Sequence, residues 1–303
     1  MAKAKKTNCI PPSQRYTIQD FNAEFPTDDV CLTAVFLSRW PEGRTMCAKC
    51  GQERKHYRVT GRTAYACDHC GNHIYPLAGT IFEKSTTSLR TWFYAMYLMG
   101  STRCGVSAKQ IQRETGVTYK TAWRMFKQIR TLMSEEISLE GEAVEMDETY
   151  MGGKRKGRSG RPGADSRKAC VVGAVERKGK VVALVANDAT SNTLKGIAKE
   201  YVLPESTIYT DEYVAYKGLD KINGYQHRRI RHKLGIYVVG DKHTNTIEGF
   251  WSLVKRGIGG VYHSVSKKYL QTYLDEYSFR YNRREEERPM FTSLLEQVWE
   301  RAS

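Results

Sequence analysis

The sequence contains no run of about 18 apolar residues, the length that a helix needs to cross a bilayer. Residues 1–7 are basic, and the apolar segment of a secretory signal does not follow them. We therefore expect a cytoplasmic protein, with residues 1–16 forming a basic, disordered tail. No internal repeat is present.

The sequence also lacks the cysteine arrangement of a disulfide framework. It has eight cysteines, of which four form two Cys-x-x-Cys pairs. The other four, Cys9, Cys31, Cys104 and Cys170, are scattered along the chain. This usage predicts a metal site in a reducing compartment.

Negative charge is scarce relative to positive charge. The chain carries 33 acidic and 48 basic residues, which gives a formal net charge of +15. Such a balance favours a polyanionic partner, most often nucleic acid. A merely soluble basic protein or attraction to a membrane surface would explain the charge alone, but nucleic acid is the stronger interpretation.

The two Cys-x-x-Cys pairs are separated by sixteen residues, and each pair is followed by Gly. Four thiolates at this spacing are typical of a structural zinc ribbon, because four protein ligands leave no coordination position open for catalysis. We assign this domain to residues 17–80. Three nearby histidines could replace a ligand but are expected at the surface: His56, His69 and His73. The predicted zinc ligands are Cys47, Cys50, Cys67 and Cys70.

Residues 81–138 show helical periodicity on both sides of a turn at Gly116. The pattern predicts a helix-turn-helix, with its second helix placed for a DNA groove. A purely structural helical hairpin would give the same pattern. The expected core is Ile111, Val117, Ala122 and Phe126, and the expected exposed residues are Tyr119, Lys120, Arg124, Lys127 and Arg130.

Residues 139–303 read as one α/β domain. Asp147 and Asp211 each end a short apolar run that predicts a strand, and Glu248 begins a helical pattern. Lys255, seven residues after Glu248, falls on the same helix face. Carboxylates gathered from two strand ends and a helix can hold two divalent cations, which can clamp the attacking and leaving oxygens of a phosphodiester.

Several residues near these carboxylates have more than one interpretation. Strand alternation should turn Glu148 and Glu212 away from the site, as outer or surface groups. Trp251, at helical spacing from Ile247 and Val254, is expected in the core. The Gly-rich basic segment 152–168 is either a solvated linker or an arm that contacts phosphate, and we favour the arm. The residues expected to contact DNA outside the helical segment are Lys154, Arg155, Lys156, Lys255 and Arg256.

Taken together, these motifs resemble bacterial insertion-sequence DDE transposases with an N-terminal zinc ribbon, the ISXO-type group. The resemblance runs from about Phe21 to Arg284. Its most specific parts are the four-cysteine ribbon and three segments: Met146-Asp-Glu-Thr-Tyr-Met-Gly-Gly-Lys154, Tyr209-Thr-Asp211 and His243-Thr-Asn-Thr-Ile-Glu-Gly-Phe-Trp-Ser-Leu-Val-Lys255.

The resemblance implies an RNase-H-like catalytic domain that uses Mg²⁺ or Mn²⁺ to cut transposon ends and join them to target DNA. It also implies a bacterial protein that is associated with the nucleoid when bound, as a homodimer or larger assembly. In this group the third ligand is Glu or Asn, with a Lys downstream. Since a carboxylate binds Mg²⁺ more strongly than an amide, we favour Glu248 over Asn245, with Lys255 near the phosphate. An inactive DNA-binding regulator and a nuclease of the same fold are the alternatives.

Overall fold

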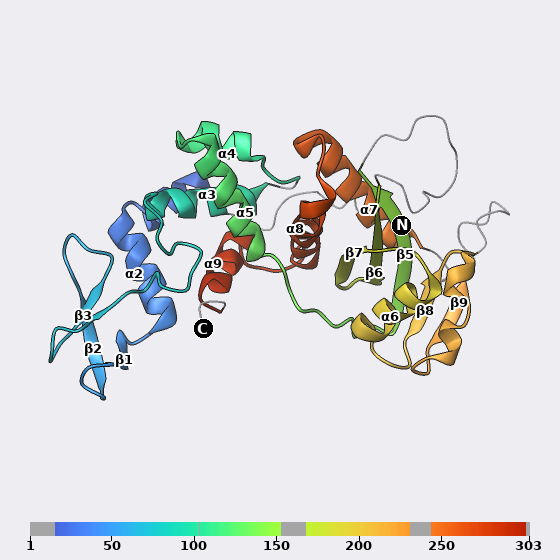
Figure 1. Cartoon of the computed structure of the whole chain (residues 1–303), viewed down its shortest axis with the longest axis horizontal. Coiled ribbons are helices and arrows are strands. Elements are labelled where there is room, and N and C mark those ends of the chain that lie inside the picture. Colours follow the sequence, from blue (N-terminus) through green and yellow to red (C-terminus); the bar gives the residue numbers. More distant parts are fainter. Residues whose placement is uncertain (1–15, 103, 153–167, 231–243, 301–303) are drawn as a thin grey trace, which may run out of the picture. The chain divides into compact units, whose positions relative to one another are not determined.

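The computed structural model describes residues 16–102, 104–152, 168–230 and 244–300 (Figure 1). The chain divides into two compact units, one made of Met1–Leu132 with Glu286–Ser303 and the other of Met133–Glu285. Within the described ranges, no helix is both long and apolar enough to span a membrane. The expected tail, apart from Tyr16, and the expected DNA contacts Lys154, Arg155 and Lys156 lie outside the described residues.

The first unit begins with two short helices and a small antiparallel sheet. Helices α1 and α2 start at threonine caps, Thr17 and Thr27, whose side chains accept backbone N–H groups. The four strands follow one another in the order β1-β2-β3-β4, as in a ribbon. The bounds are α1 Ile18–Glu24, α2 Asp28–Arg39, β1 Arg44–Met46, β2 Glu53–Arg58, β3 Tyr65–Cys67 and β4 His73–Ile74.

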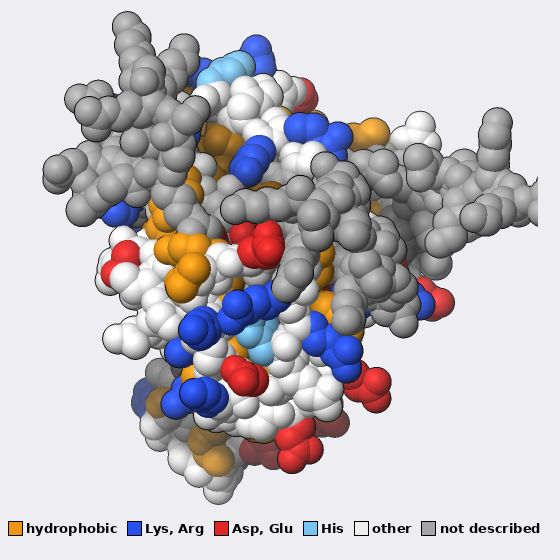
Figure 2. Space-filling model, turned by 90° about the vertical axis from the view of Figure 1, so that its right-hand side faces the viewer, with side chains coloured by type: hydrophobic (Ala, Val, Ile, Leu, Met, Phe, Trp, Pro, Cys, Tyr) orange, Lys and Arg blue, Asp and Glu red, His pale blue; other side chains and the backbone are white. Residues whose placement is uncertain are grey.

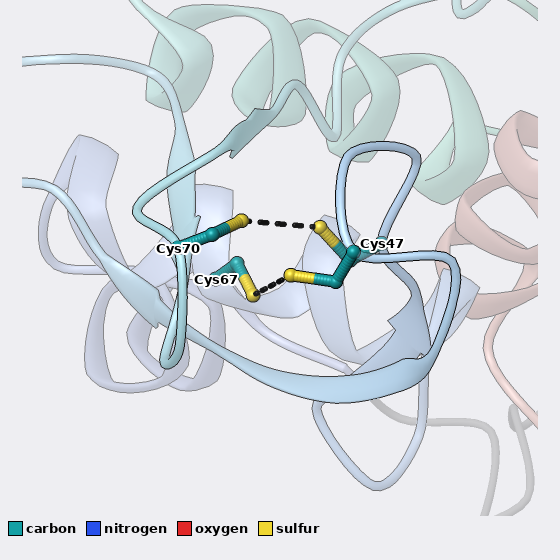
Figure 3. A group of neighbouring side chains, drawn as sticks. Cys47, Cys67 and Cys70 are labelled. Atoms are coloured by element: carbon teal, nitrogen blue, oxygen red, sulfur yellow. Dashed lines mark hydrogen bonds between the residues drawn. The ribbon is translucent and has the colours of Figure 1, made fainter.

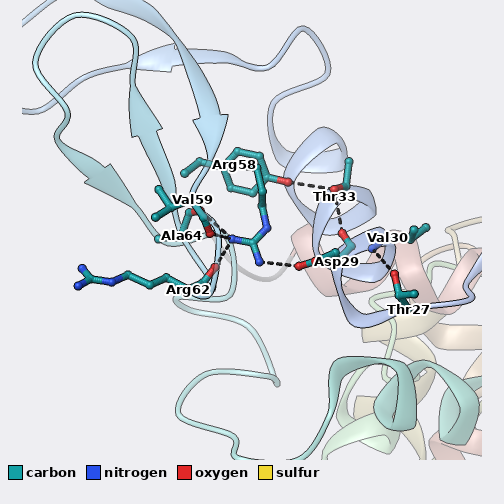
Figure 4. Close-up of polar contacts among 9 residues, drawn as sticks. Thr27, Asp29, Val30, Thr33, Arg58, Val59, Arg62 and Ala64 are labelled. Carbon is teal, nitrogen blue, oxygen red and sulfur yellow. Dashed lines mark hydrogen bonds and ion pairs between the residues drawn. The ribbon is translucent and has the colours of Figure 1, made fainter.

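The ribbon sheet is attached to α2 by stacking and by one arginine. The rings of Phe36 and Tyr65 stack with their centroids 3.7 Å apart. Arg58 reaches from β2 to the carboxylate of Asp29, at 2.6 Å, and also donates to the carbonyls of Val59 and Arg62 in the β2–β3 loop (Figure 4). Arg58 therefore ties the loop of the ribbon to the start of the helix.

The remaining helices of this unit are α3 (Leu89–Ser101), α4 (Ala108–Thr115), α5 (Tyr119–Thr131) and α9 (Met290–Glu300). Ser107 and Thr118 cap α4 and α5. Between them Gly116 has φ +71°, a left-handed conformation that glycine adopts without steric cost. The helix, turn and helix that the sequence predicted around Gly116 are confirmed.

Helix α9 lies in the first unit, although the sequence-based division placed residues 139–303 in one catalytic domain. Its Phe291 packs among the rings of Phe21, Phe25, Phe93 and Tyr97, with centroid distances of 5.8–6.4 Å. An aromatic side chain buries a large apolar area, so the contacts of Phe291 with these rings place α9 in the first unit. The second compact unit, Met133–Glu285, therefore ends before α9, whereas the domain expected from the sequence runs to residue 303.

The second unit is built on a five-stranded sheet with the order β7-β6-β5-β8-β9. Strands β5, β6 and β7 are antiparallel neighbours, whereas β8 runs parallel to both β5 and β9. Helix α6 (Ser191–Tyr201) makes the crossover that a parallel pairing requires. The strand bounds are β5 Ala143–Met151, β6 Ala169–Glu176, β7 Val181–Ala186, β8 Thr207–Thr210 and β9 Gln226–Arg229.

Alternating residues of β5 and β6 enter two separate cores. Val144 and Met146 pack on the face covered by α6, whereas Met151 packs on the face covered by α7 (Asn245–Gly257) and α8 (Leu270–Asn282). Figure 1 shows these helices on the two sides of the sheet. The multidomain α/β architecture expected from the sequence, with a ribbon, a helical segment and a mixed sheet between helices, is confirmed.

Candidate metal centres

The two predicted aspartates lie side by side where the pairing between β5 and β8 ends: Asp147 in the middle of β5 and Asp211 directly after β8. The parallel ladder between these strands ends at the pair Glu145 and Tyr209. Asp147 and Asp211 each lie two residues beyond that pair, so they leave the ladder at the same level. The carboxyl end of neighbouring parallel strands is where an α/β sheet offers a ligand site.

Three carboxylates gather at this point of the sheet. Ligand oxygens of Asp147, Glu148 and Asp211 all lie within 4.8 Å of one another. Glu148 is 9% exposed and belongs to the group, so its expected orientation away from the site is wrong. Alternation does send Asp147 and Glu148 toward opposite faces, but β8 has ended at this level and both side chains reach its open edge. Glu212, by contrast, is exposed.

Each carboxylate accepts a hydrogen bond from a different part of the fold. The indole Nε1 of Trp251 donates to Oδ2 of Asp147 at 3.1 Å, and the Tyr216 hydroxyl donates to Oε2 of Glu148 at 2.9 Å. The backbone N–H of Tyr213 donates to Oδ1 of Asp211 at 2.9 Å. Neutral donors hold the three groups, and their negative charges face one another.

The electrostatics of the group call for a cation. Burial raises the pKa of Asp147 from its ordinary 3.8 to about 7, and the charges of Glu148 and Asp211 add to the increase. A divalent ion would reverse this effect, because it favours the ionised carboxylate. The donor set, made of oxygens alone, fits Mg²⁺ or Mn²⁺.

We expect the metal-free protein to lose stability as the pH rises from about 4 to about 7. The folded-state pKa of Asp147, about 7, lies above the unfolded value, so the folded state retains a proton that the unfolded state releases in this window. The cost reaches as much as about 4 kcal/mol above pH 7. Urea unfolding from pH 4 to 8, compared with Asp147→Asn, isolates this contribution. Parallel pH curves for the two proteins would contradict the assignment. Added Mg²⁺ should return to the wild-type protein the stability that it loses at high pH.

The remaining predicted residues of the site lie along the exposed side of α7. Ile247, Trp251 and Val254 form its buried face, which leaves Asn245, Glu248 and Lys255 exposed. Glu248 accepts a hydrogen bond from the Thr244 hydroxyl at 3.0 Å. Among the described residues, Glu248 is not in the group formed by Asp147, Glu148 and Asp211. Its role as third ligand therefore stays a prediction, as does that of Asn245.

A buried glutamate, which the sequence did not single out, fixes the start of α7. Glu145 is fully buried and accepts the backbone N–H groups of Thr246 and Ile247 at 2.9 and 3.1 Å. It also accepts hydrogen bonds from the Thr246 hydroxyl at 3.0 Å and from Nε of Arg177 at 2.9 Å. A carboxylate at this position satisfies the unpaired N–H groups of the helix and opposes the positive end of its dipole. The sequence feature that could have pointed to Glu145 is its position two residues before Asp147, on the same face of the strand.

We expect Glu145→Ala to lower the free energy of unfolding by about 3–5 kcal/mol, because the change removes the buried carboxylate that is bonded to the half-buried Arg177 and to the first N–H groups of α7. Glu142→Ala is the matched control, since Glu142 is exposed and lies at the start of the same segment. Denaturant unfolding of both variants measures the difference. Equal midpoints for the two would show that Glu145 does not hold the helix.

The four predicted cysteines of the ribbon form a cluster (Figure 3). The Sγ atoms of Cys47 and Cys70 are 3.6 Å apart, and those of Cys50 and Cys67 are 3.9 Å apart. A zinc tetrahedron with Zn–S bonds of about 2.3 Å has edges of about 3.8 Å. The sulfurs therefore lie at the separations that a zinc ion requires.

The two cysteine turns of the ribbon have the same backbone pattern. In the first, Cys47 N–H donates to the Gln52 carbonyl and Gly51 N–H donates to the Cys47 carbonyl; Cys67 and Gly71 repeat these bonds in the second. The backbone N–H of Cys50 lowers the pKa of Cys47 to about 6, whereas hydrogen bonding to Cys70 raises the pKa of Cys50. Without a cation, the cluster cannot hold four thiolates.

None of the three nearby histidines belongs to the described four-cysteine cluster. His69 is exposed and His73 is half-buried. The expected surface position of His56 is wrong, because this residue is 3% exposed. It lies within the ribbon sheet, where it pairs with Cys67 across the β2–β3 ladder.

Comparison with known proteins places both metal centres in one family. Residues 138–282 match the ISXO2-like transposase domain, and residues 26–73 match the transposase zinc-ribbon domain. An uncharacterized protein in transposable element ISH50 of Halobacterium salinarum is 31% identical over 261 residues, which cover 80% of this chain and 86% of that protein. The chain belongs to the ISXO2-like transposase family. An uncharacterized transposase-like protein of Haemophilus influenzae is 32% identical over 108 residues, 36% of this chain and 85% of its own.

In this transposase-family chain, each match contains one of the two groups of candidate ligands. The ribbon match includes all four cysteines, and the transposase match extends from before β5 to the end of α8 and includes the three carboxylates. The match also includes Glu145, Tyr216 and Trp251. The partners that hold the carboxylates are therefore part of the same matched region.

The helical segment of the transposase-family chain presents fewer basic residues than expected. Lys120, Arg124 and Lys127 are exposed on α5, as predicted, but Arg130 is 1% exposed. Arg130 follows Phe126 by one helical turn on the buried face, and its guanidinium lies 3.7 Å from that ring centroid. Arg130 is thus a core residue, and its assignment as a DNA contact is wrong. Of the expected core, Ile111, Ala122 and Phe126 are buried and Val117 is half-buried.

Proposed function

We propose that this chain is a DNA transposase that cleaves transposon ends and joins them to target DNA through metal-dependent phosphoryl transfer. The observation that carries the proposal is the convergence of Asp147 and Glu148 on β5 with Asp211 after β8, in a chain of a transposase family. The four-cysteine ribbon and the exposed basic residues of α5 support DNA as the substrate.

In this proposal, Asp147 and Asp211 hold divalent cations together with a further carboxylate. Bound Mg²⁺ would activate the attacking oxygen and stabilise the charge on phosphorus. Glu148 stands with the two aspartates, and Glu248 is the alternative third ligand, with Asn245 beside it. Trp251 and Tyr216 keep the carboxylates in place, and the exposed Lys255 offers a positive charge to the phosphate.

The test uses purified protein, Mg²⁺ and labelled duplexes that carry the inverted repeats flanking the gene, with a target plasmid. We expect cleavage that leaves a free 3′-hydroxyl at the end, followed by joined products. Cleavage without joining would favour a nuclease of the same fold. Binding of the ends without any metal-dependent cleavage would favour an inactive regulator.

We also propose that the protein acts as a homodimer or larger assembly on DNA. Light scattering of the protein bound to transposon ends would measure the mass of this assembly.

The basic face of α5 gives a separate prediction about binding. Lys120 and Lys127 are exposed on α5, and in the view of Figure 2 Lys and Arg side chains form several groups at the surface. We expect Lys120→Ala and Lys127→Ala each to weaken binding to the ends and to lower the slope of log K against log salt by about 1, the effect of one lost phosphate contact. Fluorescence anisotropy across salt concentrations measures both quantities.

Arg130→Ala is the contrasting variant for this measurement, because Arg130 is buried against Phe126. It should lower the melting temperature and leave the salt slope of the folded protein unchanged. Unchanged slopes for both lysine variants would remove α5 from the DNA interface.

A further inference from the structure

Two aromatic side chains approach the carboxylate group from opposite faces of the sheet. Trp251, on α7, is 3% exposed, and Tyr216, in the short helix Val214–Tyr216, is fully buried. Each donates one hydrogen bond to one of two consecutive carboxylates: Trp251 to Asp147 and Tyr216 to Glu148. The two donors belong to different hydrophobic cores, on the two sides of β5.

The ring of Trp251 lies where only glycine leaves room for it. Gly173 on β6 is the ladder partner of Asp147. A Cβ at Gly173 would lie 2.5 Å from Cζ2 and 2.8 Å from Cη2 of Trp251, far closer than atoms can approach. The missing side chain therefore allows the indole to lie across β6, directly beside Asp147. This close approach, and not a left-handed backbone, is what requires glycine at this position.

The register of α7 on β5 brings the indole to the correct level. The N–H of Ile247 is bonded to Glu145, and one turn later the N–H of the Trp251 indole is bonded to Asp147. Four helix residues rise about 6 Å, and two strand residues rise about 6.6 Å. Because these steps agree, the helix start that Glu145 fixes also determines where Trp251 meets the strand.

On the other face, the segment that follows β8 serves two carboxylates at once. The Tyr213 backbone N–H is bonded to Asp211, and three residues later the Tyr216 hydroxyl reaches Glu148. A tyrosine hydroxyl that is bonded to a buried carboxylate acts as a donor, and this bond fixes the rotation of the carboxylate plane. The position of Glu148 is thereby linked to that of Asp211.

We propose that Trp251 and Tyr216 are positioning residues that orient Asp147 and Glu148 toward a shared divalent cation. The inference rests on the proposed function, because it concerns the metal ions of that reaction. Partners that hydrogen-bond to metal ligands fix ligand geometry, and their loss typically costs about 10–100-fold in metal affinity or activity. Neither aromatic touches the reacting atoms in this proposal; each acts through its carboxylate.

The test removes only the donor atoms, with Trp251→Phe and Tyr216→Phe in the full-length, zinc-loaded protein. Mn²⁺ binding is followed by the loss of the electron paramagnetic resonance signal of the free ion, and cleavage is measured across Mn²⁺ concentrations. We expect about tenfold or greater weakening of Mn²⁺ binding for each variant, with cleavage recovering as Mn²⁺ is raised. The melting temperature of the metal-free variants should stay close to wild type.

Two control variants remove a similar donor away from the carboxylates. Trp92→Phe loses an indole bond to the Ser85 hydroxyl, and Tyr225→Phe loses bonds to the carbonyls of Ala198 and Val202. Both should bind Mn²⁺ like wild type. Because Trp251 and Tyr216 belong to different cores, one variant remains informative if the other fails to fold.

Two results would overturn the inference while the proposed function stands. One is wild-type Mn²⁺ affinity in both variants. The other is a loss of activity that no Mn²⁺ concentration restores, accompanied by a lower melting temperature, which would make the two residues merely structural. A wild-type protein that neither binds Mn²⁺ nor cleaves DNA would instead reject the proposed function itself.

Discussion

Asp147→Asn and Asp211→Asn should each abolish cleavage and joining while leaving the binding of transposon ends intact. The amide keeps nearly the same shape as the carboxylate, so its oxygen in Asp147→Asn can still accept the Trp251 N–H, but it supplies no charge to a divalent ion. A metal ion contributes several kcal/mol of transition-state stabilisation, and every 1.36 kcal/mol is tenfold in rate. We therefore expect a loss on the order of 10³-fold or more in single-turnover cleavage.

The matched control for these variants is Asp220→Asn, since Asp220 is exposed and lies outside the described carboxylate group. It should cleave at the wild-type rate. Glu148→Gln and Glu248→Gln, measured in the same assay, compare the two candidates for the third ligand, and the variant with the larger loss identifies it. Normal cleavage by Asp147→Asn or Asp211→Asn would refute the proposed centre.

The second large effect is expected at the ribbon. Cys47→Ser should release zinc and unfold residues near 45–75, because zinc binding provides most of the folding free energy of such small domains. Only short strands of two to six residues surround the cysteines, and they offer little core of their own. Zinc content by mass spectrometry and hydrogen exchange of β1–β4 measure the two effects.

Cys104→Ser is the control for this variant, because Cys104 is exposed and lies outside the cluster. Mn²⁺ binding by the second unit should survive in both variants. A Cys47→Ser protein that keeps its zinc and still binds DNA would disprove the ligand set.

The features that the sequence predicted correctly depend on local patterns. Cysteine turns need only a few consecutive residues, and each of their bonds closes within five positions. The end of a strand just before Asp211 and the turn at Gly116 follow from an apolar run and one glycine, whereas Asp147 lies in the middle of β5 and not at the strand end that the sequence predicted. Such signals are complete within a short stretch of chain, so reading them requires no knowledge of the tertiary fold.

The features that the sequence did not predict depend on partners far along the chain. Glu148 joins the carboxylates because β8 ends beside it, and Arg130 is buried because its turn of α5 faces the core. Glu145 acts as a helix cap only because α7, about a hundred residues later in the chain, packs with its first N–H groups against β5. Alternation along one strand correctly gave opposite faces for neighbouring residues, but it could not show where the next strand stops.

The placement of Phe291 has a consequence for how the protein is made. Its ring completes the aromatic cluster of Phe21, Phe25 and Phe93, yet residues 133–285 must be synthesised before it becomes available. Domains usually fold in order as they leave the ribosome. Here the first unit must wait with an unfinished core while the second is translated. A nascent chain that stops inside the carboxylate-bearing unit therefore carries a ribbon and a helical segment without their last packing partner.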